Sequence, residues 1–335
     1  MNRSKLYPVV LLVSLCWQLP TMANPPNEHR AEKNNRSVKS QGVVLREGAG
    51  KVEILVDGQP FTTYYFEGYK KPIFFPLRAA SGTVVTRGYP MVPDVPGEAQ
   101  DHPHHKGLWF THGDVNGVDF WSESDKTGRI LHRKLEVAKS DPTVGVLKSE
   151  NDWVTPSSQV ILREVREVKI HSQPGVRVMD FDLKVTAVSD PVKFGDTKEG
   201  SFGIRLAQPF SDKDGGKMEN SRGGIGEAGC WGKPAEWVDY STKINGETVG
   251  VAIFDHPSSF RHPTHWHARA YCLFAVNPFG LHDFYKDPTK DGSHTLKAGE
   301  SLTFRYRVYI HRGNAQDAKI ADQYKAYADS VRPNP

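Results

Sequence analysis

Cysteine is scarce in this sequence. The 335 residues contain three cysteines, at positions 16, 230 and 272. A chain of this length can bury a sufficient hydrophobic core without covalent cross-links, so the composition excludes a small disulfide-bonded scaffold. No cysteine spacing typical of a zinc ribbon occurs either. Cys230 and Cys272 can pair with each other or remain as two unpaired, semi-buried thiols.

Long apolar runs are absent after the N-terminus. The first residues have the pattern of an export signal: Arg3 and Lys5 form a basic start, residues 6–19 are mostly apolar, and residues 21–23 form a small-residue cleavage site. The apolar stretch is shorter than the roughly 20 residues that a membrane span needs. We therefore expect residues 1–23 to be a signal peptide, the mature protein to be soluble and periplasmic or extracellular, and no membrane span.

Neither sign of charge dominates. The sequence has 43 Lys and Arg against 39 Asp and Glu, a formal net charge of +4, and losing Arg3 and Lys5 with the signal peptide removes two positive charges and leaves +2. A net charge so near zero gives no reason to expect a nucleic-acid partner.

Three segments follow one another along the chain. After the signal peptide, residues 24–41 are polar and charged, so this leader has too little apolar surface to bury and is expected to be disordered. From residue 42 onward, short β-type runs are divided by turn residues and no linker interrupts them. We expect one folded domain over residues 42–330.

Apolar and polar residues alternate along the β-type runs, so that each run has one apolar face. Residues 176–187 and 302–310 place apolar side chains on one face and charged ones on the other, and residues 51–66 read as a hairpin that turns at Asp57-Gly58. One-sided alternation is typical of antiparallel sheets with one face in a core. The many such runs predict an all-β fold, a large antiparallel β-sandwich.

One segment, at the C-terminus, is helical in pattern. Asn314 can cap a helix over residues 315–331, with Asp317 at the capping-box position. Its apolar stripe consists of Ile320, Tyr324, Tyr327 and Val331, with Ala321 and Ala328 beside it. We expect this helix to pack on a sheet.

Histidines gather in two places. Of the 14 histidines, four lie in residues 102–112 and four in residues 256–267. In the first cluster His102 and His104 flank Pro103, which favours extended backbone for itself and for the residue before it. On an extended segment, residues two apart project to the same side. This pair is therefore expected to offer two imidazoles to one point.

The second cluster has the same spacing in His265-Trp266-His267. A divalent metal accepts imidazole ligands, usually with a carboxylate. Candidate ligands for such a metal are His102, His104, His265 and His267. Alternatively, neutral histidines that titrate near pH 6.5 can act as general acid or base beside a carboxylate. A third interpretation places polar histidines in loops, hydrogen-bonded to backbone.

Carboxylates and aromatic rings accompany the clusters. Asp101 precedes the first, and in "FGDTKEGSFGIRL" Glu199 can act as base or acid while Arg205 can hold a carboxylate or a developing negative charge. The alternative for this segment is a surface ion pair on a hairpin. Aromatic faces beside polar groups suit a sugar ring. Trp109 and Phe110 point to opposite sides of a strand, so we expect one of them in the core.

Five segments carry a family resemblance: "DHPHHKGLWFTHGDVNGVDFW", "FGDTKEGSFGIRL", "WGKPAEWVDY", "GVAIFDHPSSFRHPTHWHARAYCLFAVNPFG" and "FRYRVYIHRG". From about residue 42 to 313 the chain resembles the family DUF6807, often labelled methane oxygenase PmoA-like. Methane oxidation does not fit, because a membrane-embedded monooxygenase subunit needs several spans. The resemblance implies an exported protein like those of glycan-degrading bacteria. The expected sandwich is similar to the galactose-mutarotase-like supersandwich, a likeness of fold that says little about reaction.

Our leading hypothesis is an exported carbohydrate-active enzyme, a hydrolase, lyase or epimerase, that acts on a glycoside or sugar by acid–base chemistry. The predicted catalytic residues are His104 and His105 for proton transfer, Asp101 to orient them, and Glu199 as the opposing acid or base. The predicted substrate-binding residues are Trp109, His112, Asp114, Trp121, Arg205, His262, Trp266, His267 and Arg269. The second hypothesis is a metal-dependent enzyme that uses the His-x-His pairs, with a divalent metal as cofactor. The third is a non-catalytic glycan-binding module.

Overall fold

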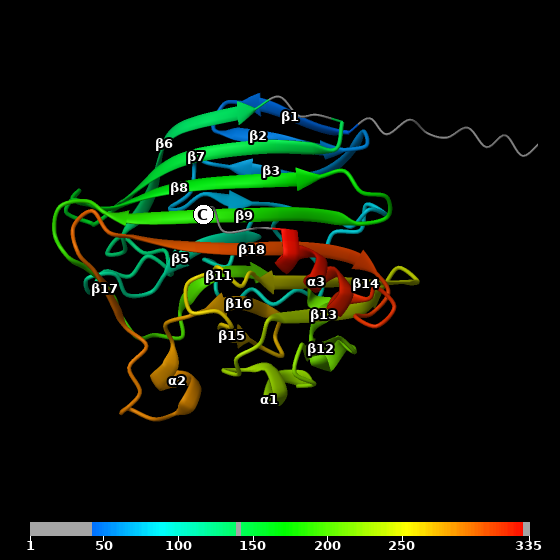
Figure 1. Cartoon of the computed structure of the whole chain (residues 1–335). Coiled ribbons are helices and arrows are strands. Elements are labelled where there is room, and N and C mark those ends of the chain that lie inside the picture. Colours follow the sequence, from blue (N-terminus) through cyan, green and yellow to red (C-terminus); the bar gives the residue numbers. More distant parts are fainter. Residues whose placement is uncertain (1–41, 139–141, 331–335) are drawn as a thin grey trace, which may run out of the picture. The chain divides into compact units, whose positions relative to one another are not determined.

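Two antiparallel sheets of eight strands each make up the fold (Figure 1). The structure, a computed structural model, describes residues 42–138 and 142–330. In spatial order, sheet 1 contains β1 (Val43–Gly48), β2 (Lys51–Val56), β3 (Gln59–Tyr65), β4 (Ile73–Phe74), β5 (Leu108–His112), β11 (Gly200–Arg205), β16 (Leu273–Asn277) and β15 (His265–Ala268). Sheet 2 contains β12 (Lys217–Asn220), β13 (Trp237–Ile244), β14 (Glu247–Asp255), β18 (Ser301–Arg312), β9 (Arg177–Ala187), β8 (Val160–His171), β7 (Val144–Val154) and β6 (Arg129–Ala138).

Short elements complete the described part. A separate two-stranded sheet pairs β10 (Val192–Phe194) with β17 (His294–Leu296). The helices are α1 (Gly226–Cys230), α2 (Leu281–Tyr285), α3 (Ile320–Ser330) and the 3₁₀ turns at Gln208–Phe210 and Asp212–Asp214. The predicted all-β sandwich with a C-terminal helix is confirmed.

The predicted signal peptide, residues 1–23, and the predicted leader, residues 24–41, lie outside the described residues. Residues 42–138 and 142–330 belong to one compact unit. Among the helices of the described part, none is long and apolar enough to cross a membrane.

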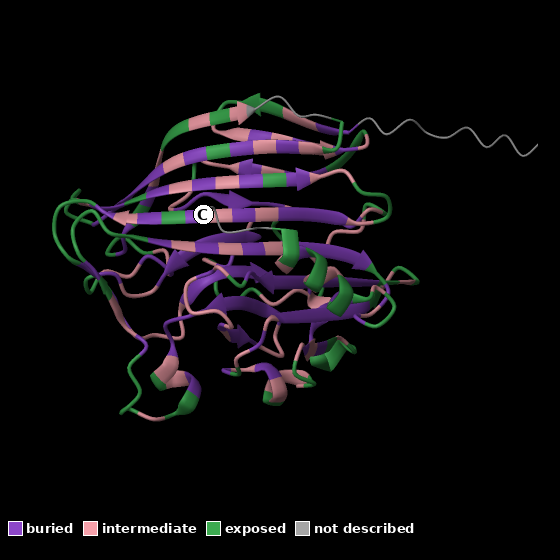
Figure 2. Cartoon of the chain, viewed as in Figure 1, coloured by how far each residue is buried: buried purple, intermediate pink, exposed green. Residues whose placement is uncertain are grey.

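The core lies between the two sheets. Along β7, β8 and β9, buried residues alternate with more exposed ones (Figure 2). Phe181 of β9 and Phe304 of β18 reach across to Phe202 and Phe110 of sheet 1. The apolar side chains that alternate along residues 176–187 and 302–310 therefore form the buried face of sheet 2, as predicted.

The predicted hairpin turns at the expected residues. Strands β2 and β3 pair with Val56 opposite Gln59, and the two residues between them, Asp57 and Gly58, have φ of 53° and 77°. Two successive positive φ values are typical of the type I′ turn, whose twist matches that of the strands. This confirms the turn and fixes the register at one edge of sheet 1.

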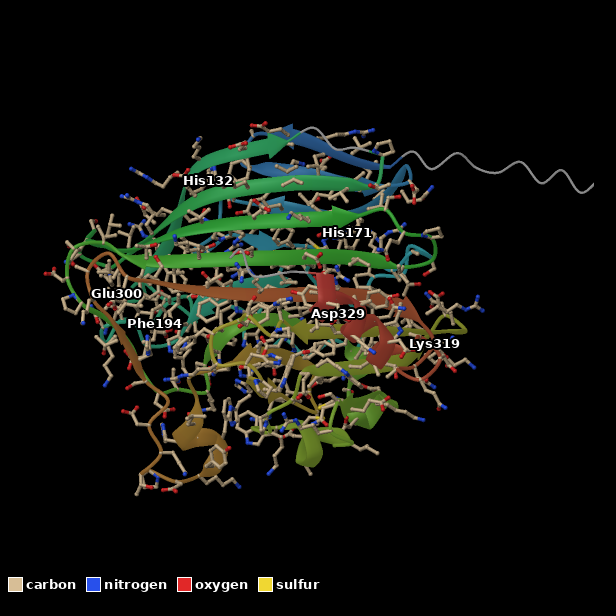
Figure 3. The ribbon with its side chains drawn as sticks, viewed as in Figure 1. His132, His171, Phe194, Glu300, Lys319 and Asp329 are labelled. Carbon is tan, nitrogen blue, oxygen red and sulfur yellow. The ribbon has the colours of Figure 1, made fainter. Side chains whose placement is uncertain are left out.

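Helix α3 begins later than predicted. Asn314 and Asp317 form the reciprocal capping contacts, with the Asp317 N–H donating to Asn314 Oδ1 at 2.9 Å and the Asn314 N–H donating to Asp317 Oδ2 at 3.2 Å. Residues 315–319 nevertheless form turns, and Lys319 has φ of 52°, so regular helix starts at Ile320. Lys319 and Asp329 mark the two ends of the helix in Figure 3.

The apolar stripe of α3 packs on the outer face of sheet 2, as predicted. Ile320 and Tyr327 are buried against Phe254 of β14 and Tyr309 of β18, and Tyr324 packs at the edge of this cluster. Val331 lies outside the described residues.

Of the two alternatives for the cysteines, the structure has free thiols: Cys230 and Cys272 are both buried and unpaired. Burial raises the pKa of each thiol to about 12, which makes both poor nucleophiles.

Candidate active site

The outer face of sheet 1 brings together residues from four strands. Trp109 of β5 lies opposite Gly203 of β11, Gly203 lies opposite Ala275 of β16, and Ala275 lies opposite His267 of β15. Residues one position away on these strands, such as Phe110, belong to the core between the sheets. Since alternate residues of a strand share a face, this row presents Trp109 and His267 away from the core.

Gly203 gives Trp109 the room that it occupies. A Cβ atom at residue 203 would lie 2.9 Å from Cζ2 of the Trp109 indole. The Trp109 ring therefore lies over the glycine and is buried completely. The first cluster of histidines is built on this indole.

We expect Gly203→Ala to disturb this arrangement. The added methyl group must displace the Trp109 ring, which should lower the free energy of unfolding by about 1–3 kcal/mol and change the near-UV circular dichroism of the tryptophans. Gly48→Ala is the matched control, because the nearest atom to a Cβ there is 3.8 Å away. Equal stability and identical spectra for both variants would contradict this packing.

The segment that carries Asp101 to His105 is a turn and not the predicted extended strand. His102 has φ of 45°, and the His105 N–H donates to the His102 carbonyl at 3.0 Å. His102 and His104 therefore do not project in parallel, and their rings meet at 73°. Pro103 favours extended backbone for the residue before it, but His102 instead has a left-handed conformation.

Four aromatic rings stack in sequence as a result of this turn. The His102 ring lies parallel to Tyr271 with 5.7 Å between centroids and parallel to His105 with 4.8 Å between them. The His105 ring in turn stacks on Trp109 at 5.3 Å, and Trp121 meets Trp109 edge to face. His102 is the exposed member of the stack, with 43% of its side chain accessible.

The carboxylate of Asp101 is held by two buried guanidinium groups. Arg87 Nη1 and Arg205 Nη2 donate to Asp101 Oδ1 at 2.5 and 2.8 Å, and Asp101 Oδ2 lies 2.9 Å from His102 Nδ1. Each arginine side chain is 2% exposed, whereas that of Asp101 is 41% exposed. Burial raises the pKa of the Asp101 carboxyl, but Arg205, His102 and Arg87 outweigh it, so its pKa lies below the ordinary value.

The predicted roles of His104 and His105 need correction, because Asp101 contacts His102 and not these two. Arg205 Nη1 donates to His105 Nδ1 at 3.1 Å, and burial, together with neighbouring cations, strongly lowers the pKa of His105. A neutral imidazole whose Nδ1 accepts from an arginine is poorly placed to carry a proton. Burial and the Lys71 ammonium lower the pKa of His104 to about 4.

A second carboxylate is shared by two lysines. Lys71 Nζ donates to Glu123 Oε1 at 2.7 Å and to the Trp121 carbonyl at 3.1 Å. Lys106 binds the other oxygen of Glu123. The Lys71 side chain is 1% exposed and that of Lys106 is 11% exposed, so this ion-pair network lies mostly below the surface.

His267 and Glu199 join the first histidine cluster from the strands beside it. The His267 Nδ1–H donates to the Lys198 carbonyl at 2.7 Å, and burial lowers the pKa of His267 to about 3. Burial raises the pKa of Glu199, and the nearby Lys198 only partly offsets this. The charge of His102 acts on the titration of both side chains. His267 of the second cluster therefore lies in the same neighbourhood as His102 of the first.

Arg269 stands beside His267 at the end of β15. Its guanidinium carbon lies 4.7 Å from the Trp231 ring centroid and 5.2 Å from that of Tyr271. Its Nε lies 3.0 Å from Glu227 Oε1, as an ion pair and not as a well-aligned hydrogen bond. The Tyr271 ring also lies under the guanidinium of Arg205, at 4.7 Å.

Buried ring nitrogens without a partner concentrate in this region. Among the described residues they include His105 Nε2, His267 Nε2, Trp109 Nε1 and Trp121 Nε1. Buried polar atoms are nearly always paired in native proteins, and exceptions are common at functional sites. These four atoms support the assignment of this face as the site.

Four predicted site residues lie elsewhere. His112 and Trp266 face the core; His112 Nε2 bonds to the Gly195 carbonyl at 2.9 Å. Asp114 accepts the Gly117 N–H within a turn, and His262 Nδ1 lies 2.8 Å from Asp255 Oδ2. The structure gives no support to the substrate-binding role predicted for Trp266 and His112, because strand alternation turns both side chains inward.

Two important residues, Arg87 and Lys71, were missed. Neither stands in a recognisable motif, and each finds its carboxylate far along the chain. The sequence contains one indication that Lys71 is buried: it directly precedes the apolar run "PIFF". A fully buried lysine requires a carboxylate partner, and that partner is Glu123.

The candidate metal ligands do not form a metal site. His265 faces outward beside His267, as the strand period predicts, but it contacts the Tyr285 hydroxyl at 3.1 Å. Within residues 42–138 and 142–330, no group of three His, Cys, Asp or Glu side chains is arranged to hold a metal ion. The described residues therefore do not fit the predicted His-x-His metal centre.

The buried neutral histidines predict a loss of stability in acid. The pKa of an unfolded histidine is near 6.5, and that of folded His267 is about 3. Between these values the unfolded chain binds a proton that the folded protein does not. The free energy of unfolding is therefore highest above pH 6.5. As the pH is lowered below 6.5, it decreases by up to about 1.4 kcal/mol per pH unit because of this group.

His267→Gln should remove this contribution. We expect urea unfolding between pH 4 and 6 to show a slope smaller by about 1.4 kcal/mol per pH unit in the variant. His282→Gln, at an exposed histidine, is the control and should keep the slope of the unmodified protein. An unchanged slope in His267→Gln would show that His267 is not held neutral.

Comparisons with known proteins give one family and several distant structures. Residues 51–325 match the DUF6807 family, which is described as a family of unknown function. No curated protein matches the sequence. The GH36 α-galactosidase AgaA of Geobacillus stearothermophilus matches 81% of this chain, which spans 40% of that enzyme's length, with 10% identity and a TM-score of 0.43.

Two smaller proteins match over nearly their whole length. A galactose mutarotase-like protein of Clostridium acetobutylicum has 11% identity and a TM-score of 0.38, with 82% of this chain and 100% of that chain covered. A putative aldose 1-epimerase of Escherichia coli K12 has 8% identity and a TM-score of 0.36, with 81% and 99% covered.

Proposed function

Because the chain belongs to the DUF6807 family, whose function is unknown, we propose a function from the site itself. The protein is an enzyme that acts on a glycoside or free sugar by acid–base chemistry, as a hydrolase, lyase or epimerase. Glu199 is the general acid, and His102, oriented by Asp101, is the general base. On the export pattern of residues 1–23, we also propose that the protein works in the periplasm or outside the cell.

One observation carries this proposal: Asp101, which contacts the His102 imidazole, and Glu199, on which the charge of His102 acts, have pKa values displaced in opposite directions. The pKa of Glu199 is raised by burial, whereas the pKa of Asp101 is lowered because Arg205, His102 and Arg87 outweigh burial. Environments that separate two titratable groups in this way are typical of acid–base sites.

The hydrogen bond at His102 supports its role as base. Asp101 is ionised, so its Oδ2 accepts the proton of His102 Nδ1 at 2.9 Å. The other ring nitrogen, Nε2, is then left with its lone pair. Because His102 is the exposed ring of the stack, this lone pair can reach a ligand. The buried rings of His105 and Trp109 hold the imidazole plane in place.

The surrounding rings favour a sugar as the ligand. Tyr271 and Trp231 are each partly exposed and stand next to carboxyl groups and guanidinium groups. A sugar ring stacks its C–H face on an aromatic ring while its hydroxyls bond to polar groups. In this arrangement a hydroxyl or ring proton moves to His102, and Glu199 protonates the departing or ring oxygen.

A substrate screen tests the proposal. The protein is incubated with a panel of neutral and acidic oligosaccharides, methyl glycosides and free sugars, and any change is followed by proton NMR. We expect turnover of at least one compound by the unmodified protein and none by the Glu199→Gln/His102→Gln double variant. Calorimetric binding of a sugar without any turnover would contradict the enzyme and favour a glycan-binding module.

A further inference from the structure

Six positively charged side chains gather at the site. Two cations share each of two carboxylates: Arg87 and Arg205 share Asp101, and Lys71 and Lys106 share Glu123. The remaining cations, Lys198 and Arg269, have one carboxylate each, Glu199 and Glu227. Asp119 also acts on Lys71, and Asp283 acts on Glu199, so the balance of charge alone does not attract an anion. An anionic ligand needs a cation whose nitrogens are free.

Three of these six cations cannot touch a ligand directly. The side chains of Arg87, Arg205 and Lys71 are exposed by 2% or less, and they are occupied by their carboxylates. Lys198 and Arg269 are different, because 41% and 29% of their side chains are exposed. Of these two, only Arg269 has a planar fork that can bind a carboxylate through two hydrogen bonds. Arg269 lies beside Tyr271 and Trp231, so a ligand that binds next to these rings would meet it.

The terminal nitrogens of Arg269 are free to bind. Its Nε faces Glu227, and Glu227 Oε2 in turn accepts the Ala270 N–H at 2.7 Å, which fixes that carboxylate. Trp231 and Tyr271 lie against the guanidinium plane. Within the described residues neither Nη1 nor Nη2 donates a hydrogen bond. The side chain is thus held by three neighbours while its outer edge stays unpaired.

We propose that the substrate is an acidic sugar, of the uronate type, and that Arg269 binds its carboxylate. The planar fork of a guanidinium matches a planar carboxylate through two parallel hydrogen bonds. Such a contact places the sugar ring beside Tyr271, in the neighbourhood of Glu199 and His102. This inference rests on the function proposed above and adds the chemical class of the substrate.

Binding calorimetry with matched sugars tests the inference. The probes are the methyl glycosides of D-glucuronate and D-galacturonate, the corresponding neutral methyl glucoside and methyl galactoside, and methyl glucoside 6-sulfate. We expect a uronate to bind roughly 10- to 100-fold more tightly than its neutral counterpart, the range for a charge-assisted pair. The tetrahedral sulfate ester should bind more weakly than the uronate.

Variants of Arg269 make the test specific. Arg269→Gln should abolish the preference for uronate, measured as the ratio of the uronate and neutral-sugar affinities in the same variant. Arg269→Lys, which keeps the charge without the fork, should recover part of this ratio. Arg163→Gln is the control, because Arg163 is an exposed arginine of β8 that pairs with Asp152 on sheet 2. Circular dichroism and thermal unfolding confirm that each variant is folded.

The outcomes separate this inference from the proposed function. Equal affinity for uronate and neutral sugar, no uronate binding, or a preference unchanged in Arg269→Gln would overturn the inference. If a neutral sugar is turned over and Glu199→Gln abolishes that turnover, the proposed function stands without the uronate preference. If neither class of sugar binds or reacts, both fall.

Discussion

Replacing Glu199 by glutamine should lower kcat by about 10²- to 10⁴-fold, the contribution of a positioned general acid, and leave the fold intact. The side chain is half-buried and its one ion pair, with Lys198 Nζ at 3.6 Å, is loose, so an amide of the same shape fits without loss of packing. The raised pKa of Glu199 adds a second expectation. In the unmodified protein the rate should fall as the pH rises past this pKa, because the acid form is lost, and the variant should lack this decline.

The matched control is Glu136→Gln, the same substitution at an exposed position of β6. It should keep the rate and the pH profile of the unmodified protein. Turnover within threefold of the unmodified rate in Glu199→Gln would show that Glu199 does not supply the proton, and the acid–base assignment would fail.

Replacing Asp101 by asparagine should reduce both activity and stability. The amide leaves Arg87 and Arg205 without the anion that both share, and both are nearly fully buried. Removing one partner of a fully buried ion pair costs about 3–5 kcal/mol. Because the Asp101 side chain is 41% exposed, solvent reduces this cost, and we expect about 1–3 kcal/mol. His102 also loses the carboxylate that fixes its tautomer, so kcat should fall by about 10²-fold or more.

Urea unfolding and turnover are measured on the same preparation of Asp101→Asn. Asp125→Asn, at an exposed residue of the loop that follows β5, is the control for a lost carboxylate on this side of the molecule. Full activity in Asp101→Asn would contradict the role of His102 as an oriented base. Unchanged stability would contradict the shared ion pair.

The sheets could be predicted because their signal is local. The period of two in residues 176–187 reports which side chains are buried, and a turn such as Asp57-Gly58 fixes register through the backbone of two residues. The same reasoning placed His265 and His267 on one face of β15. The same alternation places Trp266 on the opposite face of β15. It also places His112 on the opposite face of β5 from Trp109, which lies three positions before it.

The site was harder to predict because it depends on contacts that are distant in sequence. Arg87 and Asp101 are 14 residues apart, and Lys71 and Glu123 are 52 apart. The turn at His102 has a left-handed backbone that local preference argues against, since Pro103 favours extended structure. Asp101, Glu199, Arg205 and His102 were predicted as site residues, but the contacts of Asp101 with Arg205 and His102 were not, and Arg87 was missed. The chemistry of a carboxyl group follows from those partners.

The central claim is that Glu199 and Asp101 form a pair with separated pKa values around His102. Carbon-13 NMR of the side-chain carboxyl groups measures both values without a substrate, with signals assigned from Glu199→Gln and Asp101→Asn. We predict that Glu199 titrates above its ordinary value of 4.5 and Asp101 below its ordinary value of 3.8. Ordinary values for both groups, or the reverse order, would contradict the proposed acid and base.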